Sequence, residues 1–214
     1  MIVVTIRDYI AIMPLESIAQ NVWVSRWPHV FGGLHIGCRM SVVRLADGSL
    51  FVFSPIQIDD ELKNDIDALG PVAHIVAPSL FHHVYFGDFS AAYPDARTYG
   101  AAGLEKKRKD LSFDAELTEE GWPDELTAIS VPGTALGETE FFHHPSRTLI
   151  TADLIQNFDS SDHWPTRMYL KVAGIHKRIN TSRPIRFMYR DKREARKSID
   201  RLIELGMSRQ VSRY

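Results

Sequence analysis

Two stretches decide the fold of this chain: Val72-Ala73-His74-Ile75-Val76-Ala77-Pro78-Ser79-Leu80-Phe81-His82-His83-Val84-Tyr85-Phe86-Gly87 and Thr148-Leu149-Ile150-Thr151-Ala152-Asp153-Leu154. In each, a short apolar strand runs directly into polar or ionisable residues. In α/β proteins, ligands and metal ions collect beyond the carboxyl ends of strands. We therefore expect the functional site where these two strand ends meet.

The residues before this pair predict antiparallel strands. Segments 22–24 and 40–45 read as strands, and Asp47-Gly48 supplies the positive φ angles of a hairpin turn. Segment 50–53 is the returning strand. Ser54-Pro55 ends that strand, because proline has no N–H group to donate to a neighbouring strand.

The remaining residues predict helices alternating with strands. The acidic residues 59–61 favour a helix start, Leu62, Ile66 and Leu69 form the apolar stripe, and Gly70-Pro71 ends the helix. The later elements are expected to be a strand over 72–77, a loop over 78–83, a short helix through Phe89, a turn and strand within 93–100, an exposed charged excursion over 106–121, a strand over 126–131, a hairpin of 140–143 with 148–151, and helices from about residue 166.

Hairpins, βα units, further strands and final helices, in that order, predict a layered α/β sandwich, with strands paired into sheets and helices on the outer faces. No internal repeat and no long Pro/Gly/Ser linker divides the chain. Residues 1–214 are therefore expected to form a single domain.

Composition is that of an ordinary globular protein, with 44% hydrophobic and 24% charged residues. No apolar run is long enough to cross a membrane, and residues 1–8 do not have the pattern of a signal peptide. The single cysteine, Cys38, excludes an intrachain disulfide and a zinc site built from several thiolates. A cytoplasmic location is the expectation, with Cys38 as a small buried residue rather than a reactive thiol.

The net charge of −2 is unevenly distributed. Residues 176–214 contain twelve Lys or Arg against four Asp or Glu, so the C-terminal segment carries about +8 and the rest about −10. A basic segment of this kind can meet nucleic acid or an anionic membrane. Without aromatic interleaving or a nucleic-acid-binding signature, the solvated face of a helix is the preferred interpretation, and neither partner is expected.

The order of elements and several short motifs resemble the metallo-β-lactamase superfamily over roughly residues 17–157. This resemblance implies an α/β fold of the superfamily's kind, a four-layer αββα sandwich. More narrowly, they look like an uncharacterised metallo-β-lactamase-like family, a domain of unknown function with a degenerate metal-ligand motif. The motifs that carry this resemblance are Asp47-Gly48-Ser49-Leu50, Ser54-Pro55-Ile56, Ala77-Pro78-Ser79-Leu80-Phe81-His82-His83 and Ser146-Arg147-Thr148-Leu149-Ile150-Thr151-Ala152-Asp153-Leu154.

Active members of the superfamily carry His-x-His-x-Asp-His-x-Gly-Gly after the central strand, and these ligands hold zinc ions that activate water. Aligning the last glycine with Gly87 puts Ser79 and Phe81 at the first two histidine positions. His83 then falls on the aspartate and Val84 on the third histidine. Phenylalanine and valine cannot bind a metal, so the resemblance implies an incomplete set.

The later ligands of the superfamily are also incomplete. A histidine normally follows Pro-Gly, whereas Thr134 follows Pro132-Gly133. The bridging aspartate has a counterpart in Asp153. No histidine follows His176, so the C-terminal strand with its usual histidine is expected to be missing or truncated.

Two functions remain open at this point. In the first, His82 or His83 joins Asp153, with Glu138 or Asp88, to hold one divalent metal ion (zinc, iron or manganese). A bound water would then attack an ester, lactone or similar small molecule. In the second, no metal is bound, and a binding or scaffold protein reuses the pocket for a small ligand.

Other candidate motifs support no further site. His143 and His144 are expected to face solvent in a hairpin turn. The glycine-rich segment 32–37 precedes a strand rather than a helix, which does not fit a dinucleotide fingerprint. Gly-x-Ser-x-Gly and the phosphate-binding Gly-x-x-x-x-Gly-Lys pattern are both absent.

Overall fold

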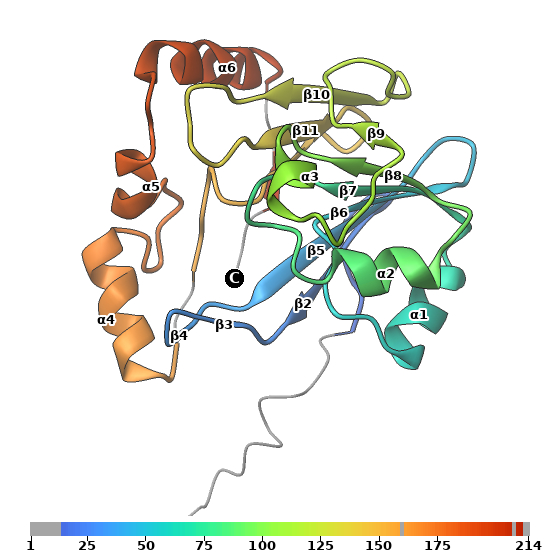
Figure 1. Ribbon diagram of the computed structural model, residues 1–214, viewed down its shortest axis with the longest axis horizontal. Coiled ribbons are helices and arrows are strands. Elements are labelled where there is room, and N and C mark those ends of the chain that lie inside the picture. The colour runs from blue at the N-terminus through green and yellow to red at the C-terminus, as the bar shows by residue number, and fades with distance from the viewer. Residues whose placement is uncertain (1–13, 159–160, 207–208, 212–214) are drawn as a thin grey trace, which may run out of the picture.

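Two β-sheets pack face to face, with helices on their outer faces (Figure 1). The structure is a computed structural model that describes residues 14–158, 161–206 and 209–211, the last three by their backbone alone. The residues from which we predicted the absence of a signal peptide lie outside these ranges. The arrangement confirms the expected αββα sandwich.

The larger sheet has seven strands and changes from antiparallel to parallel pairing at β6. In spatial order the strands are β1 (Glu16–Ala19), β2 (Val22–Trp27), β5 (Cys38–Arg44), β6 (Leu50–Phe53), β7 (Val72–Ala77), β8 (Arg97–Gly100) and β9 (Ala115–Glu116). Since β6 and β7 are parallel, with Phe53 beside Val76, their carboxyl ends lie at the same edge.

The smaller sheet has four strands, and a separate two-stranded hairpin lies between β2 and β5 in the chain. The strands of the smaller sheet are β10 (Leu126–Ser130), β11 (Thr139–His143), β12 (Thr148–Ile150) and β13 (Arg209–Val211); those of the hairpin are β3 (Val30–Phe31) and β4 (Leu34–His35). The sequence predicts that the C-terminal strand is missing or truncated. The short β13 runs parallel to β12, and its three residues include no histidine.

Six helices are found among the described residues. They are α1 (Asp60–Asp67), α2 (Phe86–Ala92), α3 (Leu104–Lys107), α4 (Trp164–Ala173), α5 (Arg183–Phe187) and α6 (Lys192–Glu204). The Asp59 side chain accepts the backbone N–H of Leu62 at 2.9 Å and caps α1, as its acidic start predicts. None of the helices in the described ranges has the length and apolar character required to span a membrane.

Three apolar clusters hold the layers together. Phe51 and Phe53 of the larger sheet meet Phe141 of the smaller sheet in the central cluster. The opposite face of the larger sheet packs against α1, α2 and α3, and the outer face of the smaller sheet packs against α6. In Figure 1 the first three helices lie on one side of the sandwich and α6 lies on the other.

One sequence expectation is confirmed only in part, and one is wrong. The segment 106–121 is mostly exposed, as expected, but β9 pairs with β8 and Leu117 is buried in the central core. His143 does not face solvent; it is buried, and its Nδ1 lies 2.7 Å from the Ser146 hydroxyl. His144 is exposed, as expected.

The loops at the carboxyl edge of the sheets bind one another through their backbones. Leu80 donates its N–H to the carbonyl of Leu136 at 2.9 Å, and Thr139 donates to Pro78 at 3.0 Å. These bonds join the loop after β7 to the loop before β11. The loop after β7 is thereby held against the segment that leads into β11.

Candidate functional site

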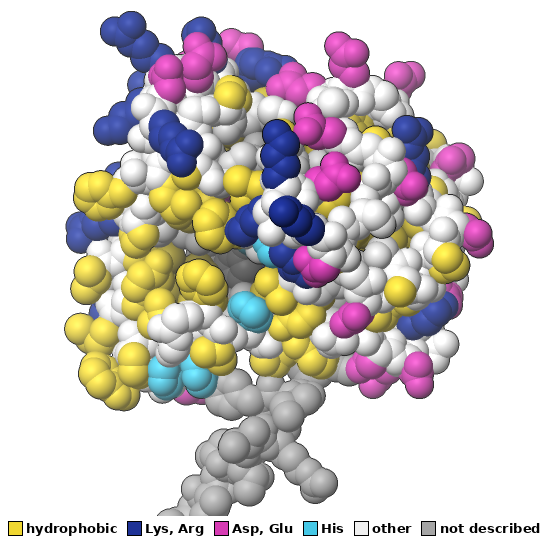
Figure 2. All heavy atoms as spheres, in the orientation of Figure 1, with side chains coloured by type: hydrophobic (Ala, Val, Ile, Leu, Met, Phe, Trp, Pro, Cys, Tyr) yellow, Lys and Arg dark blue, Asp and Glu magenta, His cyan; other side chains and the backbone are white. Residues whose placement is uncertain are grey.

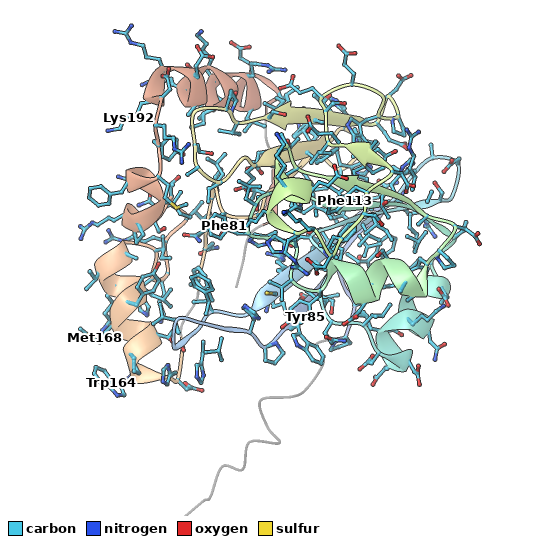
Figure 3. All side chains as sticks on the ribbon, viewed as in Figure 1. Phe81, Tyr85, Phe113, Trp164, Met168 and Lys192 are labelled. Atoms are coloured by element: carbon cyan, nitrogen blue, oxygen red, sulfur yellow. The ribbon has the colours of Figure 1, made fainter. Side chains whose placement is uncertain are left out.

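A cavity of about 400 Å³ opens where these loops meet the β3–β4 hairpin, α4 and α5. Its walls are mainly apolar, with side chains that include Phe31, Ile36, Phe81, Leu136, Phe158 and Ile185. Figure 2 shows hydrophobic side chains around the hollow, with Lys and Arg side chains beside it. Phe81 and Tyr85, both labelled in Figure 3, come from the loop after β7 and contribute to the lining.

The turn after β7 is shaped by Ser79, which is fully buried. The Ser79 hydroxyl accepts the backbone N–H groups of Phe81 and His82, each at 3.2 Å. Such local bonds stabilise a turn in place of a continuing strand. The His82 ring is thereby held at the cavity, next to the strand end that carries Ser54.

His82 lies between a hydroxyl and a carboxylate. Its Nδ1 is 2.7 Å from the Ser54 Oγ, and its Nε2 is 3.2 Å from the Asp153 Oδ2. All three residues line the cavity. An ionised carboxylate only accepts, so the proton belongs on Nε2, and Nδ1 is free to accept from the hydroxyl. Sequence and structure agree that a histidine of this loop and Asp153 meet.

The pKa of His82 is raised above its ordinary value by the net effect of opposing influences. Burial lowers it, whereas the charge of Asp153, the hydrogen bond to Asp153 and the charge of Glu138 raise it. The imidazolium form is therefore stabilised by the carboxylate beside it. This is the electrostatic setting in which a histidine can accept a proton during a reaction.

His83 is directed to a different partner. Its Nδ1 accepts a hydrogen bond from the Arg108 Nη1 at 2.7 Å, and Arg108 also forms an ion pair with Asp110 at 2.6 Å. Burial and the nearby charges of Lys107 and Arg108 lower the pKa of His83. His83 lines the cavity, but its contacts keep it apart from the His82–Asp153 pair.

Asp153 is held in place from behind by Glu138, which is almost completely buried. The Glu138 Oε1 accepts the backbone N–H groups of Ala152 and Asp153, each at 2.8 Å. Gln156 donates its amide to the Asp153 Oδ1 at 3.4 Å. The carboxylate that faces His82 is therefore fixed through both its backbone and its side chain.

Glu140 lies beside Glu138 and is fully buried on β11. Burial, the Glu138 charge and the contact with Glu138 raise the pKa of Glu140 well above its ordinary value. Burial raises the pKa of Glu138 as well, but the interaction with Glu140 and the backbone N–H group of Ala152 lower it. We therefore assign the proton of the pair to Glu140, because two backbone N–H groups bind the Glu138 carboxylate.

Cys38 and the His29–Tyr85 pair complete the polar lining of the cavity. Burial, followed by the Asp153 charge, raises the pKa of the Cys38 thiol to about 12, so the thiol stays protonated near neutral pH. The Tyr85 hydroxyl lies 3.0 Å from the His29 Nδ1. Cys38 is half-buried, which agrees in part with the sequence prediction that it is a small buried residue.

Other residues singled out from the sequence lie elsewhere. Asp88 is on α2 and does not line the cavity. Neither do His143 and His144, on and just after β11. The sequence analysis missed Ser54, Gln156 and Glu140; Ser54-Pro55 at a strand end was the one available signal for the first of these.

The donor set does not suit a divalent metal ion. Within the described ranges no group of three or more His, Cys, Asp or Glu side chains is placed to hold one. Both ring nitrogens of His82 already have partners, and a guanidinium group occupies the Nδ1 of His83. A catalytic zinc site normally has three protein ligands and one open position.

Solved structures with the same fold include metallo-β-lactamases. DIM-1 metallo-β-lactamase exposed to ceftazidime has a TM-score of 0.60 at 14% identity, over 88% of this chain and 99% of that one. The mono-zinc form of FIM-1 from Pseudomonas aeruginosa has a TM-score of 0.54 at 13% identity, over 91% and 98%. The metal-soaked Flv1 flavodiiron core from Synechocystis sp. PCC6803 has a TM-score of 0.58 at 15% identity, over 91% and 53%.

At these identities the likeness shows the fold alone. No curated protein matches the sequence. One protein family does match, over residues 20–198. Because that match spans most of the chain, the protein belongs to the family described as Domain of unknown function (DUF4336), and it has the metallo-β-lactamase fold.

Proposed function

We propose that this protein is a hydrolase of small, largely apolar esters or lactones, with its reaction centre at His82 and Asp153. The observation that carries the proposal is the 3.2 Å contact between these two side chains within an apolar cavity. Histidine is the side chain that most often serves in general acid–base catalysis, and a carboxylate beside it orients the ring and stabilises the imidazolium.

In the proposed reaction, His82 moves the proton. Its Nδ1 takes a proton from the attacking group, and Asp153 stabilises the imidazolium that forms through the bond at Nε2. Ser54 contacts one ring nitrogen of His82 and Asp153 contacts the other, so the orientation of the imidazole ring is fixed before substrate arrives. Such prior positioning reduces the entropy that the reaction must otherwise lose.

A metal-dependent version, with His82, His83 and Asp153 holding zinc, iron or manganese, has less support. It requires His83 to leave Arg108 and turn toward Asp153, because no group of three His, Cys, Asp or Glu side chains within the described ranges is placed to hold a metal ion as it stands. The residues present therefore do not fit a bound metal, and no step of the proposed reaction passes through one.

The cavity lining suggests the kind of substrate. Apolar side chains such as Phe81 and Ile185 favour an apolar acyl or alkyl group, because they are already in contact with the space it would fill. Lys107 brings one positive charge to the same cavity, and its Nζ lies 4.6 Å from the centre of the Phe81 ring. Small esters with one polar end match this distribution.

Hydrolysis of a series of p-nitrophenyl esters and small lactones by chelator-treated protein tests the proposal. We expect measurable turnover that falls by about 10²–10⁴-fold in His82→Ala. His144→Ala is the matched control, because this histidine is exposed and lies outside the cavity. Absence of turnover with every ester and lactone, or equal turnover in His82→Ala, would overturn the proposal.

A second candidate is a binding protein that takes up an apolar small molecule without converting it. The observation in its favour is the predominance of apolar residues in the cavity lining. It predicts saturable binding of an apolar fluorescent probe, unchanged in His82→Ala, together with no hydrolysis. The same esters, used as competitors in that experiment, distinguish the two candidates.

A further inference from the structure

Ser54 has an unusual backbone conformation for a residue with a side chain. It follows β6 directly, has a φ of +56° and precedes Pro55. Positive φ is unfavourable for non-glycine residues, and a proline that follows restricts the backbone further. The hydrogen bond from the Ser54 N–H to the carbonyl of Val76, at 2.9 Å, holds the residue in place. Strain of this kind collects at functional sites.

The strained backbone directs the Ser54 hydroxyl toward His82 and the cavity. Ser54 as a whole is only 4% exposed, yet it contributes to the cavity lining. Its Oγ is the partner of the His82 Nδ1 at 2.7 Å, and Asp153 binds the other ring nitrogen. Hydroxyl, imidazole and carboxylate therefore form one chain of hydrogen bonds.

We propose that Ser54 is a catalytic nucleophile and that Ser54, His82 and Asp153 act as a serine hydrolase triad on the metallo-β-lactamase fold. Triads are recognised by geometry and role, not by position in the sequence, and they occur on unrelated folds. The two ring nitrogens exchange their common roles here: Nδ1 faces the serine and Nε2 faces the carboxylate. Either nitrogen of a neutral imidazole can accept a proton.

A purely orienting role for Ser54 explains less of the geometry. A serine that only fixes the imidazole ring can adopt any relaxed conformation and has no need to line the cavity. Ser146 illustrates that role, since its Oγ lies 2.7 Å from the Nδ1 of the buried His143 but it does not line the cavity. Ser54 combines the same contact with positive φ, a carboxylate partner and access to the cavity.

The proposed reaction needs only the ester and water. The Ser54 Oγ attacks the acyl carbon while its proton passes to the His82 Nδ1. The bond from the acyl carbon to the leaving oxygen then breaks, and His82 gives its proton to the departing alcohol. Water attacks the resulting acyl ester of Ser54, its proton passes to Nδ1, and the carboxylic acid leaves as Ser54 regains the proton.

This inference rests on the proposed hydrolase function and names its nucleophile, so the two can fail separately. An alkyl fluorophosphonate reacts covalently with an activated serine and needs no turnover. Intact-mass measurement of the treated protein should show one adduct per chain, and peptide mapping should place it on Ser54. Labelling should be slowed by at least about 10²-fold in His82→Ala.

Two substitutions keep this experiment interpretable. Ser54→Gly removes the hydroxyl but accepts positive φ without strain, so it should fold at least as well as the natural chain and take no label. Ser146→Ala removes the serine of the other Ser–His pair and should label normally.

The outcomes separate the two proposals. Ester turnover that depends on His82, with no label on Ser54 and undiminished activity in Ser54→Gly, would overturn the serine nucleophile and leave the hydrolase. Label on Ser54 that needs His82 supports the triad even where the chosen esters are poor substrates. Neither label nor turnover would overturn both.

Discussion

The Glu138 side chain holds the backbone of Asp153 in place: its carboxylate Oε1 accepts the Asp153 N–H at 2.8 Å. The same oxygen accepts the N–H of Ala152, also at 2.8 Å. A buried carboxylate before β11 thus fixes the segment after β12 at the point where Asp153 meets His82. Glu138 is a positioning residue in this account, because it acts on the reaction through Asp153.

Replacing Glu138 with alanine should damage both stability and activity. Two buried N–H groups lose their acceptor, at a cost of about 1–3 kcal/mol each. Asp153 is then no longer held against His82, so kcat should fall more than KM changes. Urea denaturation and steady-state kinetics measure the two effects.

Glu138→Gln is the matched comparison, since its amide oxygen can still accept both N–H groups. We expect most of the stability to return in this variant. Equal stability in Glu138→Ala and the natural chain would show that the buried carboxylate does not support the segment.

Glu140→Gln should stabilise the protein at neutral pH but not in acid. The folded chain raises the pKa of Glu140, so above the ordinary value of 4.5 the unfolded chain releases a proton that the folded chain keeps. Stability then falls as pH rises. Glutamine cannot ionise, and its amide still donates to Glu138.

A gain of about 1 kcal/mol would raise the melting temperature by about 2–4 °C in a chain of this size. Thermal melts of both proteins at pH 4 and pH 7.5 make the comparison. A gain of the same size at both pH values would contradict the assignment of the proton to Glu140.

The hydrolytic rate should fall as the medium becomes acidic, because His82 must be neutral to accept a proton. Burial lowers the pKa of His82, but Asp153 and Glu138 raise it by more, so the net shift is upward. The loss of hydrolytic rate should therefore begin above the ordinary value of 6.5. In Asp153→Asn the main raising influence is removed. The acid limb of kcat/KM should then move to lower pH while the maximum rate falls. Identical limbs in the two proteins would argue against His82 as the base.

Removal of metal ions should leave the hydrolytic rate unchanged, and the two adjacent histidines should differ in importance. His83 is bound to Arg108, so His83→Ala should reduce kcat far less than His82→Ala. Dialysis against a chelator, followed by addition of zinc, iron or manganese, provides the measurement. Loss of activity on chelation, restored by one equivalent of metal and abolished equally by both substitutions, would favour the metal-dependent alternative.

Much of the fold was predictable, because local patterns determine it. The apolar run 72–77 became β7 with the predicted bounds, and Asp59 caps α1 through a bond three residues along the chain. The excursion over 106–121 was predicted only in part: most of it is exposed, but Leu117 enters the core and β9 pairs with β8.

The site was only partly predictable. The proximity of a loop histidine to Asp153 followed from the positions of the strand ends. The choice between His82 and His83 could not be predicted, because it depends on a turn formed by Ser79 and on Arg108, which is 25 residues from His83 in the chain. Ser54 was read only as a strand end, because its role depends on a positive φ and a contact 28 residues along the chain. The proposed triad is not part of the superfamily motifs, so those motifs could not predict it.

The most direct measurement is a crystal structure of the protein after reaction with an alkyl fluorophosphonate. We expect a covalent bond between phosphorus and the Ser54 Oγ, with the alkyl chain in the apolar cavity and His82 still between Ser54 and Asp153. An unmodified Ser54, with a metal ion held by His82 and Asp153 in the same cavity, would contradict it.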